Sequence, residues 1–199
     1  MFDLPDFKSA NVELLALLRR LSVFTGDFTL ASGAKSNYYI DCRLTTLHPK
    51  GAWLVGNLMR HLIFTELGKR NATIKAVGGL TMGADPISLA ISVASYLHDP
   101  ATAVNSFVVR KAPKSHGQTK LIEGEFKPGD RVVVIDDVIT TGESTIKAID
   151  AIIQAGGIVE FAAVLVDREQ GGRQNIEAKG YKTLAAFTRS VLLPDLRPS

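Results

Sequence analysis

The sequence predicts an α/β fold in which a parallel sheet is flanked by helices. Short runs of β-branched residues alternate along the chain with longer segments of helical periodicity, an order that builds parallel sheets. The clearest run, residues 132–135, has four β-branched apolar residues and fits a strand buried on both faces. Asp136 and Asp137 follow it, at the strand end where open α/β sheets place their ligands.

Composition favours one globular domain spanning residues 1–199. The chain is 46% hydrophobic and 22% charged, which suits a domain with a sizeable core. Its formal charge is only +3, from 23 basic and 20 acidic residues, and this argues against nucleic acid as a partner. Cys42 is the single cysteine, so no intrachain disulfide can form and a cytoplasmic location is expected.

The chain is not expected to enter a membrane. No apolar run approaches the roughly 20 residues that span a bilayer. The first residues include Asp3 and Asp6 and lack a basic segment followed by an apolar one, so no signal peptide is expected.

The N-terminal third predicts two helices separated by a hairpin. Leucines at positions 14, 17, 18 and 21 recur at helical spacing, which predicts an amphipathic helix over residues 8–21. Residues 23–41 indicate two short strands around a glycine turn. A second helix is expected from Pro49 to about Glu66, with proline at its first position.

A glycine-rich loop follows the first predicted core strand, residues 74–77. The loop covers residues 78–85, and Asp85-Pro86 is expected to cap and start a buried helix that ends near Leu97. Its residues fit two interpretations equally well. One is a tight strand-to-helix turn, and the other is a backbone cradle for pyrophosphate beside the N-terminus of a helix.

A cationic segment follows the next predicted strand, residues 106–109, and contains no acid. Its cations, counting a protonated histidine, are Arg110, Lys111, Lys114, His116 and Lys120. The segment is expected to be a surface loop. A solvated basic loop is the ordinary alternative, and a nucleic-acid patch is disfavoured because no aromatics separate the cations. The loop leaves a strand on the same side as the paired aspartates, where it could balance a diphosphate.

The residues after the paired aspartates predict a phosphate site. Small polar residues cluster where the next helix begins, namely Thr140, Thr141, Gly142, Ser144 and Thr145. Backbone N–H groups at the N-terminus of a helix suit an anion. The carboxylates of Asp136 and Asp137 suit sugar hydroxyls or a divalent metal, so a sugar phosphate satisfies both groups. The alternative is a simple strand-to-helix turn capped by Asp and Thr.

The C-terminal half continues the alternation of strands and helices. A return hairpin is expected over residues 121–130, and Ile146, Ile149 and Ile153 mark the buried face of a helix. Strands are expected at residues 158–166 and 184–187, with a short helix at 174–178 between them. Arg168 follows the first of these strands, where it could pair with Asp167 or Glu169.

The stretch Val-Ile-Asp-Asp-Val-Ile-Thr-Thr-Gly, residues 134–142, resembles the ribose-5-phosphate signature of type I phosphoribosyltransferases. The resemblance implies the donor 5-phosphoribosyl-1-pyrophosphate (PRPP) and Mg²⁺ bound mainly through substrate and water, with no direct protein ligand. The donor-binding residues that it implies in this stretch and just beyond are Asp136, Asp137, Val138, Ile139, Thr140, Thr141, Gly142, Glu143 and Ser144.

Residues 28–39 and 110–117 resemble two segments of orotate phosphoribosyltransferases, a hood over the base and a catalytic loop. The resemblance implies that the loop residues Arg110, Lys111, Lys114 and His116 bind the pyrophosphate group. The implied orotate contacts are Tyr39, Ile40, Thr140 and Arg168. The implied catalytic residues are Lys111, Lys114, His116, Asp136 and Asp137. The chain departs from some members at Ala31, Ile40 and Thr81-Met82.

The resemblance implies transfer of a phosphoribosyl group to orotate by a homodimer whose loop is shared between subunits. Residues 1–48 would form mainly an N-terminal helix and the hood, and residues 70–190 the α/β core. Two alternatives remain at this point. One is a phosphoribosyltransferase for purines or another base, and the other is a regulatory protein of the same fold that senses the donor.

Overall fold

The structure, a computed structural model, describes residues 6–29, 35–112 and 121–195. The strands of its main sheet are β3 (Ala76–Leu80), β4 (Asn105–Val109), β5 (Ile122–Gly124), β6 (Arg131–Ile139), β7 (Ile158–Asp167) and β8 (Thr183–Thr188). Their order is β5-β4-β3-β6-β7-β8, and neighbours pair in parallel except β4 and β5. A separate antiparallel hairpin contains β1 (Val23–Thr29) and β2 (Lys35–Ile40).

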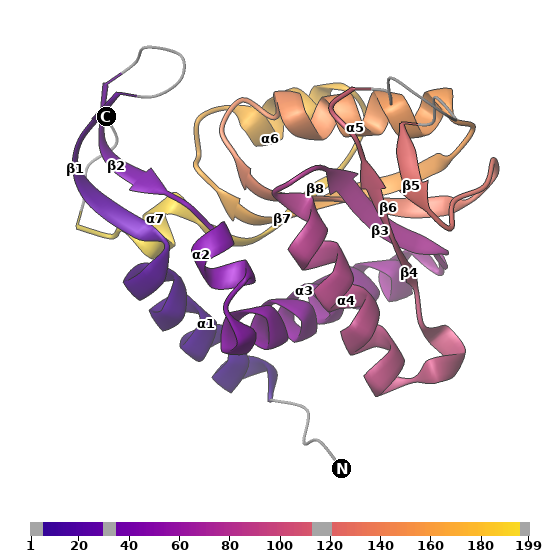
Figure 1. Cartoon of the computed structure of the whole chain (residues 1–199), viewed down its shortest axis with the longest axis horizontal. Helices are drawn as coiled ribbons and strands as arrows, with labels where there is room; N and C mark the ends of the chain where they lie inside the picture. Colours follow the sequence, from indigo (N-terminus) through magenta and orange to yellow (C-terminus); the bar gives the residue numbers. More distant parts are fainter. Residues whose placement is uncertain (1–5, 30–34, 113–120, 196–199) are drawn as a thin grey trace.

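Helices cover both faces of the main sheet (Figure 1). They are α1 (Phe7–Leu21), α2 (Arg43–Thr46), α3 (Pro49–Arg70), α4 (Ala84–His98), the 3-10 helix η1 (Pro100–Thr102), α5 (Glu143–Gln154), α6 (Gly172–Ala178) and α7 (Arg189–Leu192). α1, α3 and α4 share one hydrophobic cluster with the sheet, and α5 and α6 share a second cluster on the other face. This arrangement confirms the predicted fold class, with the N-terminal helix and hairpin beside the sheet.

Strand β6 belongs to both clusters because successive side chains of a strand point to opposite faces. Val133 and Ile135 pack in the cluster of α3 and α4, whereas Val132 and Val134 pack in the cluster of α5. All four are fully buried, as predicted for a strand covered on both sides. Each such side chain stabilises the fold by about 1.5–3 kcal/mol relative to an exposed one.

Two strands continue past the ends predicted for them. β3 runs through Gly78 and Gly79, and β6 includes Asp136 and Asp137. The ladders explain this, because backbone pairing with β4 and β7 continues whatever the side chain. Glycine is required at position 79, where a Cβ would collide with the carbonyl oxygen of Ile135.

Two predictions were wrong, one about the start of a helix and one about the buried face of another. Helix α4 is preceded by Gly83 rather than capped by Asp85, whose carboxylate instead accepts a hydrogen bond from the hydroxyl of Thr81 at 2.6 Å. Ile153 is 46% exposed because the buried stripe of α5 is rotated from the one that the isoleucines suggested. That stripe consists of Thr145, Ala148, Ile149 and Ile152.

Helix α4 also exposes more apolar surface than predicted. The helix was expected to be buried, but its Leu89 and Val93 are 60% and 50% exposed. The short helices α2, η1 and α7 were not predicted, because three or four residues show no periodicity. Within the described ranges, no helix combines the length and hydrophobicity needed to cross a bilayer.

Two glycines of α3 should respond oppositely to alanine. At Gly56 a Cβ would lie 2.5 Å from the carbonyl oxygen of Ala90, so Gly56→Ala should push α3 and α4 apart and destabilise by about 1–3 kcal/mol. At Gly68 a Cβ would meet no atom of the described residues within 4 Å, so Gly68→Ala should stabilise the helix by about 0.5–1 kcal/mol. Urea denaturation of both variants measures the difference, and equal effects would contradict this packing.

Candidate active site

A cavity lies where the connections of the main sheet diverge. Strand β3 lies between β4 and β6, and the loops that leave β3 and β6 enter helices on opposite faces of the sheet. Open α/β sheets bind ligands in such a crevice at the carboxyl ends of their strands. The cavity measures about 280 Å³. Its lining residues are Tyr39, Ile40, Asp41, Arg43, Leu80, Thr81, Met82, Gly83, Lys111, Asp136, Asp137, Val138 and Ser144.

The paired carboxylates of β6 approach the cavity from opposite faces of the sheet. Asp136 is directed toward α5, where its Oδ2 accepts a hydrogen bond of 2.6 Å from the hydroxyl of Thr145. Asp137 is directed toward the loop between β3 and α4, so close to Gly83 that any Cβ there would collide with Oδ1. The backbone N–H of Val138 donates to the same Oδ1 at 2.8 Å. Both aspartates are therefore fixed by neighbours on separate elements.

Burial makes both carboxylates costly to ionise. It raises the pKa of Asp136 to about 7, and the nearby charge of Asp137 adds to the rise while the hydroxyl of Thr145 opposes it. Burial also raises the pKa of Asp137, against the hydrogen bond from Val138 and the positive charge of Arg43. Such carboxylates gain most from a bound cation or from hydroxyl donors, so the pair suits a sugar and a metal.

The donor set at the paired aspartates fits a partly hydrated Mg²⁺. Within the described ranges, no group of three or more His, Cys, Asp or Glu side chains is arranged to hold a metal. Asp136 and Asp137 supply two carboxylates, and Mg²⁺ commonly takes one or two carboxylates together with waters and substrate phosphates.

The loop after β6 presents the N-terminus of α5 beside the carboxylates. Gly142 precedes the helix with φ +78°, and among the described residues this N-cap position makes no side-chain hydrogen bond to the first turn. A side chain at position 142 would meet the backbone of Gly172 at 2.7 Å, and the amide of Asn175 donates to the carbonyl of Thr141 at 3.0 Å. The contacts with Gly172 and Asn175 fix the position of this loop, and the uncapped N-terminus of α5 suits a phosphate.

The loop between β3 and α4 lines the opposite side of the cavity. Leu80, Thr81, Met82 and Gly83 all contribute, with a cis peptide bond between Thr81 and Met82. The hydroxyl of Thr81 already donates a hydrogen bond to Asp85, so a ligand would contact the backbone of this loop rather than that side chain.

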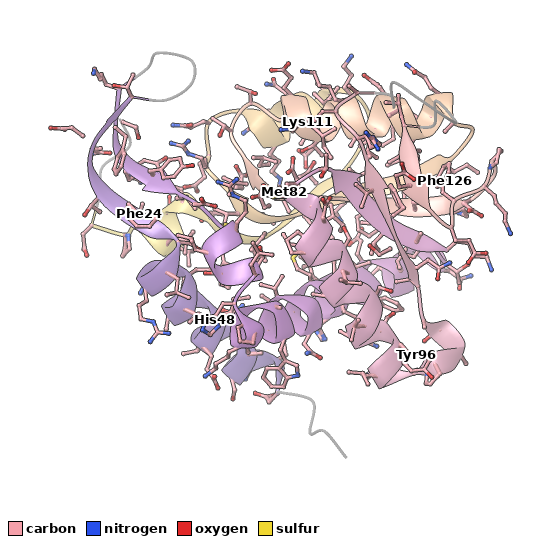
Figure 2. The ribbon with its side chains drawn as sticks, in the orientation of Figure 1. Phe24, His48, Met82, Tyr96, Lys111 and Phe126 are labelled. Carbon is pink, nitrogen blue, oxygen red and sulfur yellow. The ribbon has the colours of Figure 1, made fainter. Side chains whose placement is uncertain are left out.

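The cationic segment reaches the cavity through Lys111 (Figure 2). Arg110 is placed differently, with its guanidinium bonded to Glu123 at 3.4 Å and to the carbonyl of Ala112 at 3.3 Å. Lys114 and His116 lie outside the described residues.

The hood residues expected at the base lie on opposite faces of one strand. Tyr39 is 39% exposed and groups with Phe24 and Phe28, at centroid distances of 6.5 and 5.8 Å. Ile40, the next residue of β2, points the other way and is buried. Both line the cavity.

Arg168 lies buried behind the hood rather than in the cavity lining. Its Nε donates to the hydroxyl of Tyr38 at 3.3 Å, and its guanidinium lies 4.8 Å from the centre of that ring. Its Nη2 is buried without a hydrogen-bond partner among the described residues. An unpaired buried donor is costly, so this N–H group is poised for an acceptor. Thr140 is likewise absent from the lining.

The sequence interpretation missed three residues of the hood. Asp41 and Arg43 line the cavity, and Tyr38 supports Arg168. The pattern Asp-Cys-Arg directly after a predicted strand was the available signal for the first two. No sequence pattern predicted the role of Tyr38, because its partner Arg168 lies 130 residues away in the chain.

The family follows from comparison with known proteins. Residues 54–191 match the model of the phosphoribosyl transferase domain. An orotate phosphoribosyltransferase of Rhodopirellula baltica is 41% identical over 184 residues, which are 90% of this chain and 94% of that protein. The chain belongs to the orotate phosphoribosyltransferase family. The predicted resemblance is thereby confirmed over nearly the whole chain.

Solved orotate phosphoribosyltransferases of Mycobacterium tuberculosis H37Rv share this fold. The one in complex with Fe(III) dicitrate has a TM-score of 0.78 at 41% identity, covering 92% of this chain and 98% of that one. Another, in complex with 5-phospho-alpha-D-ribosyl 1-diphosphate, has a TM-score of 0.71 at 35% identity and covers 92% of both chains.

Asp136 should lower the stability of the ligand-free protein at neutral and higher pH. Its pKa near 7 lies above the ordinary carboxyl value, so between about pH 4 and pH 7 the folded protein binds more protons than the unfolded chain. The free energy of unfolding should fall as pH rises through this window. Asp136→Asn should remove the penalty and, at pH 8, be more stable than the wild type by on the order of 2 kcal/mol.

Urea denaturation from pH 4.5 to pH 8 measures this effect. Asp150→Asn, an exposed position on α5, is the control and should follow the wild type. An Asp136→Asn variant whose stability tracks the wild type at every pH would show that the buried carboxyl is not the source.

Proposed function

We propose that this chain transfers the 5-phosphoribosyl group of PRPP to orotate, giving orotidine 5′-phosphate and pyrophosphate in de novo pyrimidine (UMP) biosynthesis. One observation carries the proposal. A single cavity in a member of the orotate phosphoribosyltransferase family is bordered by one buried and one partly buried carboxylate, an open helix N-terminus and a lysine. These groups match the hydroxyls, the 5′-phosphate and the diphosphate of the donor.

The donor binds along the carboxyl edge of β6. Asp136 and Asp137 accept hydrogen bonds from the ribose hydroxyls. The loop from residue 138 to residue 144 surrounds the 5′-phosphate, with N–H groups at the start of α5 directed at it. Asp136 and Asp137 would hold Mg²⁺ mainly through water and substrate, and the ion would supply positive charge to offset that of the diphosphate.

The reaction breaks the C–O bond at the anomeric carbon and forms a C–N bond to orotate. Positive charge develops on the ribose and negative charge on the departing pyrophosphate, so the protein acts by orienting the reactants and stabilising the leaving group. Lys111 supplies one cation from the edge of the cavity. Lys114 and His116 arrive with the loop as it closes, exclude water and add their charge.

Orotate lies under the hood. Tyr39 offers an aromatic face to the flat pyrimidine, and Ile40 packs beside it. Arg168 binds the carboxylate through the N–H groups that Tyr38 leaves free, and Thr140 contacts the ring. The planar guanidinium of an arginine can donate two hydrogen bonds to one carboxylate in a fixed geometry, which a lysine cannot do.

The active form is a homodimer that shares the catalytic loop. Helix α4 carries an exposed apolar stripe that reaches Tyr96 near its C-terminal end, and the exposed Met82 lies in the loop that precedes the helix (Figure 2). The stripe on α4 consists of Leu89, Val93, Tyr96 and Leu97. Such a surface suits a second copy of the chain. Arg110 is bonded to Glu123 and is not among the lining residues of its own cavity, which fits a contact with the partner's active site.

The chain works as a single domain in the cytoplasm. The hood, within residues 1–48, and the core, within residues 70–190, both contribute to the cavity lining, so neither part has a complete site alone. Its one cysteine, Cys42, is a buried free thiol, which suits a reducing compartment.

The purified protein should consume orotate, measured as loss of its ultraviolet absorbance, only when PRPP and Mg²⁺ are both present. In a panel of bases, hypoxanthine, adenine and uracil should give little turnover because they lack the carboxylate that Arg168 recognises. Turnover of a purine in preference to orotate would contradict the proposal.

Arg168→Ala should raise the KM for orotate by about tenfold or more, the effect expected from losing a charge-assisted hydrogen bond. The KM for PRPP should change little. The variant should also lose discrimination between orotate and uracil, which a purely structural defect would not cause. Tyr38→Phe keeps the ring but removes the hydroxyl that holds Nε, so it should show the same pattern more weakly. Unchanged orotate kinetics in both variants would remove Arg168 from the base site.

A further inference from the structure

We propose that Arg43, held in place by Asp41, is an additional binding residue for the diphosphate of the donor. This inference rests on the proposed function, because it assigns a ligand to the same cavity. Neither residue belongs to the motifs by which the sequence resembles its family.

Asp41 fixes the guanidinium of Arg43 through one of its edges. Nε donates to Oδ1 at 2.8 Å, Nη2 donates to Oδ2 at 2.7 Å, and the backbone N–H of Arg43 donates to Oδ1 at 3.1 Å. This bidentate pair uses two of the five guanidinium N–H groups. The remaining three have no hydrogen-bond acceptor within the part of the chain that the structure describes.

The fixed guanidinium borders the proposed donor site. Arg43 and Asp41 line the same cavity as Asp137, Met82 and Lys111. The hydrogen bond to Asp41 is the main cause that raises the pKa of Arg43, and the charge of Asp137 adds a smaller contribution. Arg43 in turn opposes the rise that burial causes in the pKa of Asp137, so the two charges lie within electrostatic reach. Arg43 therefore shares a cavity with the carboxylate that borders the loop between β3 and α4, where the diphosphate is expected.

The charges around the cavity favour a polyanion bound by an extra cation. Three carboxylates line it, those of Asp41, Asp136 and Asp137, whereas Arg43 and Lys111 are the cations among the described lining residues. A diphosphate brought against Asp137 is repelled unless cations compensate it. Arg43 is suited to this because its bond to Asp41 has already ordered the side chain, and 46% of that side chain is open to ligand.

The pairing also explains why arginine occupies this position. A planar guanidinium can bind a carboxylate along one edge and phosphate oxygens along another. A lysine at position 43 could make a single charged contact but could not keep both partners in a fixed geometry. A residue that only lowered the pKa of Asp137 would not need the bidentate pair with Asp41.

The test measures binding of Mg-pyrophosphate and of orotate by calorimetry for the full chain, together with the KM for PRPP. Arg43→Ala should weaken Mg-pyrophosphate binding and raise the KM for PRPP by about tenfold or more, the scale of a lost charge-assisted hydrogen bond. Orotate affinity should stay within about twofold. Arg43→Lys should show a smaller loss, and Asp41→Asn should also weaken pyrophosphate because the guanidinium is no longer held.

Arg131→Ala is the matched control. Arg131 is 50% exposed in its side chain and pairs with Glu160, but it begins β6 at the end of the strand opposite the cavity. This variant should bind pyrophosphate as the wild type does. If Arg43→Ala fails to fold, as seen by thermal unfolding, Arg43→Lys and Arg43→Gln decide the question by the same measurements.

Wild-type pyrophosphate affinity in folded Arg43 variants, with orotate turnover intact in the wild type, would overturn the role of Arg43 and leave the proposed function standing. A changed pH dependence of stability without any loss of pyrophosphate binding would likewise overturn it, since Arg43 would then act only on Asp137. A wild type that does not consume orotate would instead refute the proposed function.

Discussion

The alternation of side chains at the end of β6 is the constraint on which the site depends. β6 pairs in parallel with β3 and β7 and packs on both faces, so a slip of one residue would move every side chain, including those of the two aspartates, to the opposite face. That register sends Asp136 toward α5 and Asp137 toward α4. The two carboxylates therefore border one cavity while each is held by a different layer of the fold.

The loops around the carboxylates are shaped by close backbone approach. Gly83 lets Asp137 lie against the loop before α4, and Gly142 lets the start of α5 lie on Gly172. A side chain at either position would displace the groups that meet the ligand. The site thus combines a rigid sheet edge with tight turns, and this pre-orders it for a transition state whose charge is spread between ribose and diphosphate.

The hood contributes side chains that complete the site on the core. Arg168 belongs to the core, yet Tyr38 from β2 sets the position of its guanidinium. Asp41 and Arg43 follow the same strand and bring a further ion pair to the cavity. One short hairpin and the turn after it therefore contribute both to the contact with Arg168 and to the cavity lining. In the proposed function, a shift of the hood would affect the binding of both substrates.

Sequence alone determined the α/β class, the strand that ends in Asp136 and Asp137, and the family, because these depend on local periodicity and on contiguous motifs. It did not determine the length of β3 and β6, the exposed stripe of α4 or the rotated buried face of α5. Those depend on which neighbours cover each element, and such neighbours are distant in the chain. The contact of Arg168 with Tyr38 and the position of Arg43 in the same cavity lining as Asp137 were decided only by the tertiary structure. These side chains come from segments far apart in the chain, so no local sequence pattern predicts that they come together.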